Sequence, residues 1–180
     1  MTIYIRPETP ADYSAIHALT SDAFPNSTAN EPGIVADLRA ASALTLSLVA
    51  VDSAAAETII GHIAFSPVVI TPPPSSNKKW FGLAPISVAP QRQGHGVGRQ
   101  LIEEGLAKLK SMEGVQGCVL LGDPKFYNRF GFMAGQGLGL AGVPPEYFMS
   151  CVLDGSECPT GEVKFHPAFD QSLTDADTKH

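Results

Sequence analysis

The densest group of residues suited to chemistry is a turn with glycines at alternate positions, Gly94, Gly96 and Gly98. An apolar stretch ending in Ile86-Ser87-Val88 precedes the turn, and an amphipathic segment begins directly after it. A strand, a glycine turn and a helix in this order gather unpaired backbone N–H groups at a helix N-terminus, where anions bind. The segment therefore predicts an anion site.

Two common phosphate motifs do not fit this turn. A dinucleotide fingerprint, G-x-G-x-x-G, needs glycine at its sixth position, which here is Arg99 or Leu101. A P-loop needs Gly-Lys-Ser/Thr, which the turn does not contain. The pattern that fits is Gln93-x-x-Gly96-x-Gly98. A bare connection without a ligand is the alternative, but alternate glycines lose much conformational entropy on folding, so a binding role is favoured.

This pattern resembles the acyl-CoA signature Q/R-x-x-G-x-G/A of the GCN5-related N-acetyltransferases, the GNAT superfamily. The resemblance implies that the pyrophosphate of coenzyme A lies against the glycines and their N–H groups. It also implies that the pantetheine arm pairs with the strand like an added strand. The cofactor-binding residues expected from it are Ile86, Ser87, Val88, Gln93, Gly94, His95, Gly96, Val97, Gly98 and Arg99, with Arg92 a further candidate for phosphate contact.

A second group of residues lies further along the chain, in Gly122-Asp123-Pro124-Lys125-Phe126-Tyr127 and the following Arg129-Phe130-Gly131-Phe132. Together with Gly61-His62-Ile63-Ala64-Phe65-Ser66-Pro67, it resembles the YhbS-type predicted N-acetyltransferases, from Ile3 to about Phe169. In many members of the superfamily a tyrosine at this place protonates the departing thiolate, which implies a catalytic role for Tyr127. The residues alone leave a second interpretation open, because a tyrosine between phenylalanines often packs in the core.

Four other polar residues have both a chemical and a structural interpretation. Asp123 could act as a base, but Asp before Pro at a helix start favours capping. His62 lies between apolar strand residues and is expected in the core. His95 is expected in solvent and Cys118 as a small buried side chain.

The remaining candidates are weaker still. Lys78 and Lys79 could meet the adenosine 3′-phosphate, although surface lysines are usually solvated. Phe65, Trp80 and Phe81 are expected in the core rather than in an acceptor pocket.

The sequence departs from the superfamily in the residues that move protons. Many members carry Glu or Asp on the central strands as a base, and Trp80 to Val88 has neither. Pro85 also removes one backbone donor from this strand. An Asn that often precedes the tyrosine is missing, with Leu120 nearby. Deprotonation of an acceptor is therefore left to water or to a residue that the sequence does not identify.

Composition bounds the class of protein. The 180 residues are 44% hydrophobic, enough for one domain, expected over residues 1–169, with a polar tail at 170–180. The net charge of −6 disfavours nucleic acid and anionic membranes as partners. We find no secretory signal and no apolar run of about 20 residues. Three scattered cysteines match no metal spacing and predict reduced thiols in a cytoplasmic (cytosolic) protein without a bound metal.

Hydrophobic periodicity predicts an α/β (α+β) fold with one parallel crossover. The resemblance implies a single GNAT-type domain, in which a mixed, mostly antiparallel central sheet is flanked by helices and its splayed central strands form the acyl-CoA cleft. Strands are expected at residues 2–6, 44–51, 58–71, 80–88, 115–121, 147–153 and 162–165. Helices are expected at residues 10–24, 32–41, 97–112 and 124–130.

These observations predict an acyl-CoA-dependent N-acyltransferase that transfers acetyl from acetyl-CoA to an amine by direct attack. A non-catalytic acyl-CoA-binding or regulatory module is the alternative, which the missing strand carboxylate favours. The acceptor is a small molecule or a protein amine. Its pocket is expected to depend on loops such as Thr71 to Lys79 and Gly135 to Pro145. A homodimer is consistent with the resemblance, since dimers are frequent in the superfamily.

Overall fold

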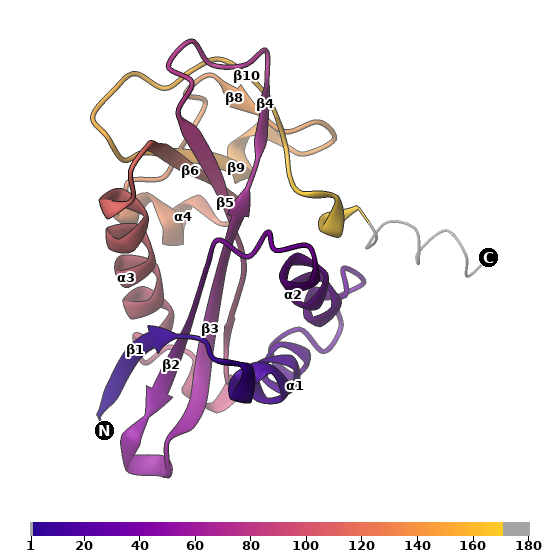
Figure 1. Ribbon diagram of the computed structural model, residues 1–180, viewed down its shortest axis with the longest axis vertical. Coiled ribbons are helices and arrows are strands. Elements are labelled where there is room, and N and C mark those ends of the chain that lie inside the picture. The colour runs from indigo at the N-terminus through magenta and orange to yellow at the C-terminus, as the bar shows by residue number, and fades with distance from the viewer. Residues whose placement is uncertain (1, 171–180) are drawn as a thin grey trace, which may run out of the picture. The chain divides into compact units, whose positions relative to one another are not determined.

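The computed structural model describes residues 2–170 (Figure 1). They form two compact units, the first made of residues 2–65, 84–105 and 167–170, the second of Ser66–Leu83 and Leu106–His166. Strand β5 (Lys79–Val88) and helix α3 (Val97–Ser111) each run through both units. The predicted polar tail lies outside the described residues from position 171 onward.

Unit 1 is built on antiparallel strands. β1 (Ile3–Pro7) pairs with β2 (Leu46–Asp52), which pairs with β3 (Thr58–Pro67). β5 follows β3 in the strand order, and Ala89 N–H donates to Ile60 O at 2.9 Å. The register shifts between Ala50↔Gly61 and Val51↔Ile59, which leaves one extra residue on β3. This bulge is the irregularity that a glycine within a strand predicts.

Helices cover both sides of these strands (Figure 1). On one side lie α1 (Tyr13–Ala23) and α2 (Glu31–Ala40), from which Ile16 and Val35 pack against Val49 and Val51. The helical turn before α1 begins at Pro10, where the predicted helix begins, and Thr9 precedes it as the N-cap residue. There the Asp12 carboxylate accepts hydrogen bonds from the N–H and Oγ of Thr9, at 2.7 and 3.1 Å.

On the other side of β3, helix α3 approaches closely through two glycines. A Cβ on Gly61 would lie 2.9 Å from side-chain atoms of Val97 and Leu101. A Cβ on Gly105, within α3, would lie 2.6 Å from the ring of Phe65. Since real Cβ atoms do not approach this closely, both positions require glycine. This explains the glycine in an otherwise good helix.

Unit 2 combines two sheets. The first half of β5 pairs in parallel with β6 (Val115–Leu121), and β9 (Phe148–Val152) lies antiparallel between β6 and β7 (Met133–Ala134). A second sheet contains β4 (Val69–Thr71), β10 (Gly161–Lys164) and β8 (Leu138–Gly139). The short helix α4 (Pro124–Tyr127) follows β6. Only Gly122 and Asp123 separate the end of β6 from the start of α4, so α4 directly follows a buried strand.

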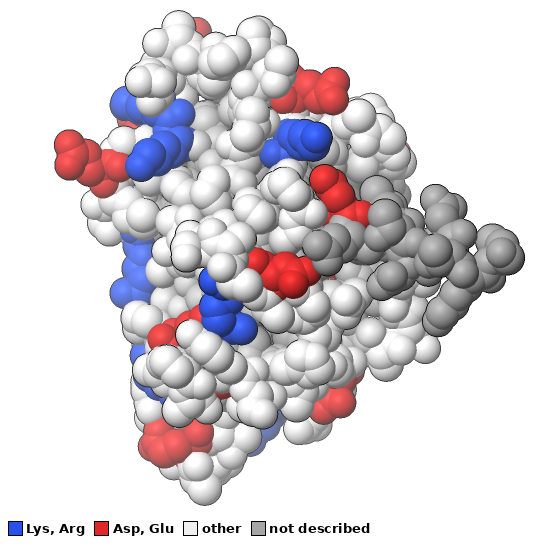
Figure 2. All heavy atoms as spheres, turned by 45° about the vertical axis from the view of Figure 1, so that its right-hand side comes forward, with Lys and Arg blue, Asp and Glu red and all other residues white. Residues whose placement is uncertain are grey.

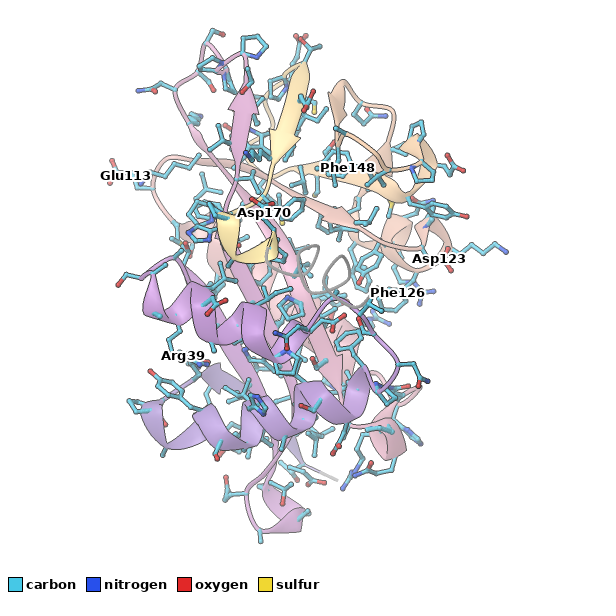
Figure 3. All side chains as sticks on the ribbon, turned by 90° about the vertical axis from the view of Figure 1, so that its right-hand side faces the viewer. Arg39, Glu113, Asp123, Phe126, Phe148 and Asp170 are labelled. Carbon is cyan, nitrogen blue, oxygen red and sulfur yellow. The ribbon has the colours of Figure 1, made fainter. Side chains whose placement is uncertain are left out.

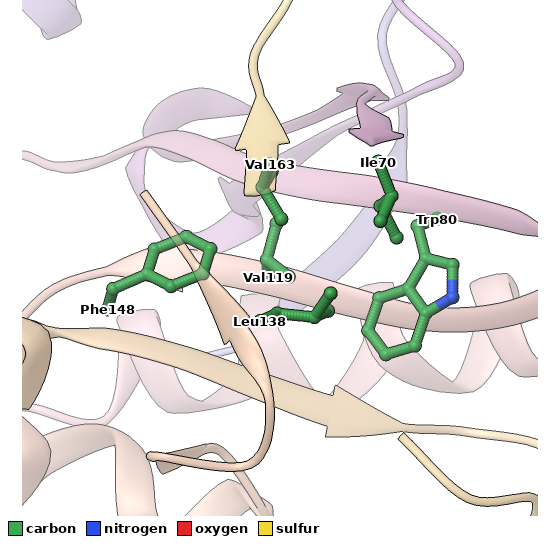
Figure 4. Close-up of a cluster of buried hydrophobic side chains, with 6 residues drawn as sticks. All are labelled: Ile70, Trp80, Val119, Leu138, Phe148 and Val163. Carbon is green, nitrogen blue, oxygen red and sulfur yellow. The ribbon is translucent and has the colours of Figure 1, made fainter. Parts of the chain in front are cut away.

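A cluster of buried side chains joins the two sheets of unit 2 (Figure 4). Its members are Ile70, Trp80, Val119, Leu138, Phe148 and Val163. The indole N–H of Trp80 donates to Gln116 Oε1 at 3.0 Å, so burial leaves no polar atom of this ring unpaired. The expectation that Trp80 is a core residue is confirmed.

One predicted element is wrong. We expected a single strand from Thr58 to Thr71, whereas β3 ends at Pro67 and β4 begins at Val69. The two strands belong to different sheets, because β4 pairs with β10 rather than continuing beside β2. Proline has no N–H for a sheet ladder, which explains the break at Pro67.

The close approach of α3 to β3 gives a stability prediction. Gly105→Ala should lower the free energy of unfolding by about 1–2 kcal/mol, because overpacking against Phe65 outweighs the gain in helix propensity of about 1 kcal/mol. Urea unfolding followed by circular dichroism measures this change. The double variant Gly105→Ala/Phe65→Leu is the control, since it returns space to the new methyl group. A more stable Gly105→Ala protein would contradict the packing argument.

Candidate active site

The glycine turn has a backbone conformation that only glycine adopts easily. Gly94 and Gly96 have φ angles of 77° and 81°, in the left-handed region. A Cβ built at either position would meet no atom within 4 Å. The two glycines are therefore required by their backbone angles, and the space beside them is open.

The turn ends in a set of N–H donors. The Gln100 N–H donates to Gly96 O at 3.1 Å and closes the first turn of α3. The N–H groups of Val97, Gly98 and Arg99 precede this bond and have no acceptor within the helix. The positive end of the helix dipole lies at the same place. Since the turn is exposed, these donors can receive an anion.

The side chain of Gln93 braces the turn against the end of β5. Its Nε2 donates to Val88 O at 3.1 Å. The next side chain, His95, is exposed and bonds through Nδ1 to Gln93 O at 2.8 Å. Because a carbonyl oxygen only accepts, Nδ1 carries the proton in neutral His95. The turn is thus held by two side-chain bonds of its own.

The strand before the turn presents its residues to opposite sides. Ser87 is buried and its hydroxyl donates to Thr20 Oγ1 of α1 at 3.4 Å. Val88 points the other way, toward α3, since a Cβ on Gly98 would lie 3.7 Å from its Cγ2. Ile86 shares the side of Val88 by alternation. Of the three predicted strand residues, Ile86 and Val88 are half-buried and Ser87 is a core contact.

The two predicted phosphate arginines are engaged within unit 1. Arg92 pairs with the buried carboxylate of Asp52 at 2.7 Å. Arg99 pairs with Glu103, one helical turn along α3, at 2.8 Å, and its side chain is 65% exposed. An exposed pair of this kind contributes little to stability, so its side chains can rearrange. Arg99 therefore suits a phosphate contact better than Arg92.

Tyr127 lies at the end of α4 in unit 2, within an aromatic group. Its ring meets Phe126 and Phe132 edge to face, with centroids 5.0 and 6.1 Å away. Burial raises the pKa of Tyr127 above its usual value, which keeps the phenol protonated at neutral pH. A protonated hydroxyl in partly buried surroundings is consistent with the predicted general acid. The ring contacts are equally consistent with the second interpretation, in which Tyr127 only packs.

Asp123 caps the helix that carries Tyr127. Its Oδ1 accepts a hydrogen bond from the Lys125 N–H at 2.9 Å. This is the capping role that the sequence favoured over a catalytic base. Figure 3 labels Asp123 and Phe126 at the two ends of the first turn of α4.

Several of the weaker candidates prove to be structural. Phe65 and Phe81 are core residues. Cys118 is fully buried, which raises the pKa of its thiol. Lys78 pairs with Asp154 at 2.6 Å, but 45% of its side chain is exposed, so the pair can rearrange and a phosphate contact stays a prediction.

His62 belongs to a buried polar network that the sequence did not reveal. Arg39 of α2 (Figure 3) donates two bonds to Glu8, each of 3.0 Å. Ser47 donates to the same carboxylate at 2.7 Å. The Ser47 Oγ lies 2.8 Å from His62 Nε2. Because the Ser47 proton is already donated, Nε2 must supply the proton of this second bond, and Nδ1 is the bare nitrogen.

Burial determines how these groups ionise. Burial lowers the pKa of His62 from 6.5 to about 4. Burial alone would raise the pKa of Glu8, but hydrogen bonds from Arg39 and Ser47 prevail and hold it below its usual value. His62 Nδ1 has no hydrogen-bond partner among the described residues. The network therefore consists of an ionised Glu8–Arg39 pair and a neutral histidine, which is the core role expected for His62.

The surface and the titratable groups add three observations. On the face in Figure 2, positive and negative side chains are interspersed over the described residues. Within residues 2–170, no three His, Cys, Asp or Glu side chains form a cluster that could hold a metal. No helix in the same range has the length and apolar character to cross a membrane.

The comparison with known proteins identifies the family. The sequence matches the family described as Acetyltransferase (GNAT) domain over residues 4–135, more than half of the chain. The chain therefore belongs to the GNAT acetyltransferases and is an N-acetyltransferase of that family. The predicted fold class, a single α/β domain with a mixed, mostly antiparallel sheet flanked by helices, is confirmed.

The similar proteins include YhbS, as the sequence predicted. Escherichia coli (strain K12) "Uncharacterized N-acetyltransferase YhbS" is 41% identical over 128 residues, 71% of this chain and 72% of that protein. A crystal structure of E. coli YhbS in complex with CoA has a TM-score of 0.80 and 35% identity, covering 93% of this chain and 92% of that one. A Brucella melitensis GNAT family acetyltransferase in complex with acetyl-CoA has a TM-score of 0.79 and 45% identity, covering 94% and 99%.

The neutral state of His62 predicts a pH dependence of stability. The unfolded chain takes up a proton near pH 6.5, whereas folded His62 resists it to about pH 4. Unfolding therefore becomes easier as the pH falls through this interval, by up to about 3 kcal/mol. Urea unfolding at a series of pH values measures it. His62→Gln should flatten the slope between pH 6.5 and 4, and His17→Gln controls for loss of a histidine. An unchanged slope in His62→Gln would refute the assignment.

Proposed function

We propose that this protein transfers an acetyl group from acetyl-CoA to an amine by direct attack of the amine on the thioester. The observation that carries the proposal is the exposed turn Gln93 to Arg99, whose left-handed glycines and unpaired helix N–H groups suit a pyrophosphate. The complexes of the Brucella and E. coli relatives with acetyl-CoA and CoA support it.

The donor is bound by backbone groups in this proposal. The pyrophosphate accepts hydrogen bonds from the N–H groups at the start of α3, and Arg99 leaves Glu103 to join it. The pantetheine arm pairs with the backbone of Ile86 and Val88 on β5, as a peptide strand adds to a sheet edge. This binding relies on main-chain geometry, which explains why the turn contains three glycines and no lysine.

The chemical step needs a polarised carbonyl and a protonated leaving group. The N–H of Val88, or of a neighbour on β5, donates to the thioester oxygen as negative charge develops there. The ammonium group of the acceptor first gives a proton to water. The neutral amine nitrogen then forms a bond to the carbonyl carbon, and the carbon–sulfur bond breaks. Tyr127 gives its proton to the departing sulfur, and the proton of the new ammonium group leaves to water. The proposed roles require no carboxylate on β5.

A non-catalytic acyl-CoA-binding module is the alternative for this chain. The absence of Glu and Asp from Trp80 to Val88 favours it. A thiol reagent that detects free coenzyme A, used with acetyl-CoA and a panel of amines, separates the two. Release that depends on an amine supports the transferase. Tight acetyl-CoA binding without release on any amine would support the module.

The positive φ of Gly96 gives a test of donor binding. Gly96→Val should weaken acetyl-CoA binding at least about tenfold, because a β-branched residue at this φ distorts the turn. Isothermal titration calorimetry measures the affinity. Gly135→Val is the matched control, since Gly135 also has a positive φ with open space beside it and lies in unit 2. Equal affinity in the two variants would overturn the cofactor assignment.

The phenol of Tyr127 gives a test of the acid. Tyr127→Phe keeps the ring contacts with Phe126 and Phe132 and removes only the hydroxyl. The turnover number kcat should fall about 10²-fold, at the lower end of general-acid contributions, with acetyl-CoA affinity unchanged. Tyr4→Phe, an exposed tyrosine on β1, is the control. An unaltered kcat would leave Tyr127 as a packing residue only.

A further inference from the structure

Unit 2 carries an apolar pocket that the proposed mechanism does not use. Its volume is about 340 Å³, and it is lined by Leu121, Gly122, Gly142, Val143, Pro144 and Tyr147. Pockets that bind small molecules begin at about this size. Leu121 and Tyr147 are 52% and 46% exposed, so a ligand can reach both side chains from solvent. No lining side chain carries a charge, so the pocket suits an apolar group.

The walls of this pocket are held in place by the backbone. The Gly122 N–H donates to Tyr147 O at 2.9 Å, which joins the end of β6 to the segment before β9. The Tyr147 N–H donates to Pro144 O at 3.1 Å and closes the turn between them. Val143 packs against the buried cluster of Figure 4. The pocket is therefore formed before any ligand binds, which lowers the entropy lost on binding.

Gly122 connects the pocket to Tyr127. It lines the pocket, and a Cβ built on it would lie 2.4 Å from the Tyr127 ring. The ring therefore fills the space that a side chain at position 122 would occupy. A ligand in the pocket is separated from the proposed acid by a single residue without a side chain.

Two acidic residues stand next to the pocket residues along the chain. Asp123 follows Gly122, Glu146 precedes Tyr147, and both side chains are exposed. Asp123 is exposed at the start of α4, where Figure 3 labels it. An amine in water is a cation, which carboxylates attract. Apolar walls with acidic neighbours fit a molecule that is an ammonium at one end and apolar at the other.

We propose that this pocket binds the apolar part of the acceptor, so that the acceptor is an amine with an aliphatic or aromatic group. This inference rests on the proposed acetyltransferase function and specifies its substrate class. The apolar group is buried against Leu121, Val143 and Tyr147, and the amine extends past Gly122 toward Tyr127. Binding energy comes from the apolar area removed from water.

The experiment compares two amines on protein saturated with CoA. The probes are 2-phenylethylamine, which is apolar beyond its amine, and ethanolamine, which is polar. Calorimetric titration should show tighter binding of 2-phenylethylamine. Leu121→Ser should weaken that binding about tenfold, as expected when an apolar side chain is removed from a pocket wall, and leave CoA affinity unchanged. Met133→Ser is the matched control, because Met133 is 55% exposed on β7 and lies outside the pocket lining.

The outcomes separate the pocket from the proposed function. Equal affinity of 2-phenylethylamine for wild type and Leu121→Ser would overturn the pocket assignment. A Leu121→Ser variant that changes only the affinity for butyryl-CoA would also overturn it, because the pocket would then bind the acyl chain. A variant that changes only the dimerisation of the protein would do the same. Acetylation of the amines, followed as CoA release, tests the transferase separately. Amine binding that depends on Leu121 without acetylation would retain the pocket and reject the transferase.

Discussion

The proposed donor site depends on how closely α3 can lie against β3. Gly61 and Gly105 remove the two side chains that would hold the helix away, one on the strand and one on the helix. Phe65 and Leu101 then fill the interface, both fully buried. Close-packed side chains hold the helix in one position against the strand. This contact therefore determines where the N-terminus of α3 lies. The N–H groups of Val97 and Gly98 are therefore placed by core contacts that begin at Val97 itself and extend about two helical turns along α3 to Gly105.

The backbone rather than charged side chains supplies most of the proposed anion site. Arg92 is committed to Asp52 and Arg99 pairs with Glu103, so neither side chain is held ready for a ligand. The N–H groups of the turn, in contrast, are oriented by left-handed glycines and by the Gln93 bond to Val88 O. Oriented dipoles need little reorganisation when charge arrives. This explains how a chain with net charge −6 can suit a polyanionic donor.

Local sequence patterns predicted most helices and strands well, but they predicted contacts between residues far apart in the chain poorly. β6 has the predicted bounds, Val115–Leu121, because it is an unbroken apolar run, and the turn at Gly94 follows from glycine chemistry alone. The break between β3 and β4 was missed although Pro67 marks its place in the sequence. The pairing of β4 with β10, some ninety residues away in the chain, gives no local signal that the strand changes sheets. The sequence predicted that an acceptor pocket depends on the loops Thr71 to Lys79 and Gly135 to Pro145, and only the second of these loops lines the pocket of unit 2. Its other wall, Leu121 and Gly122, is joined to it by a long-range hydrogen bond that no local pattern shows.

The pKa of Tyr127 limits what this residue contributes. Burial raises it above 10.0, whereas a free thiol has a pKa near 8.5. Complete transfer of a proton from phenol to thiolate is therefore uphill when the thiolate is in water. The same burial also destabilises a thiolate formed beside the ring, so its basicity rises as the carbon–sulfur bond breaks. In the proposed mechanism Tyr127 would therefore act late in the reaction, as a donor to charge that appears only in the transition state. A group used in this way is compatible with a site that has no carboxylate on β5, because in the proposed step water accepts the protons of the amine.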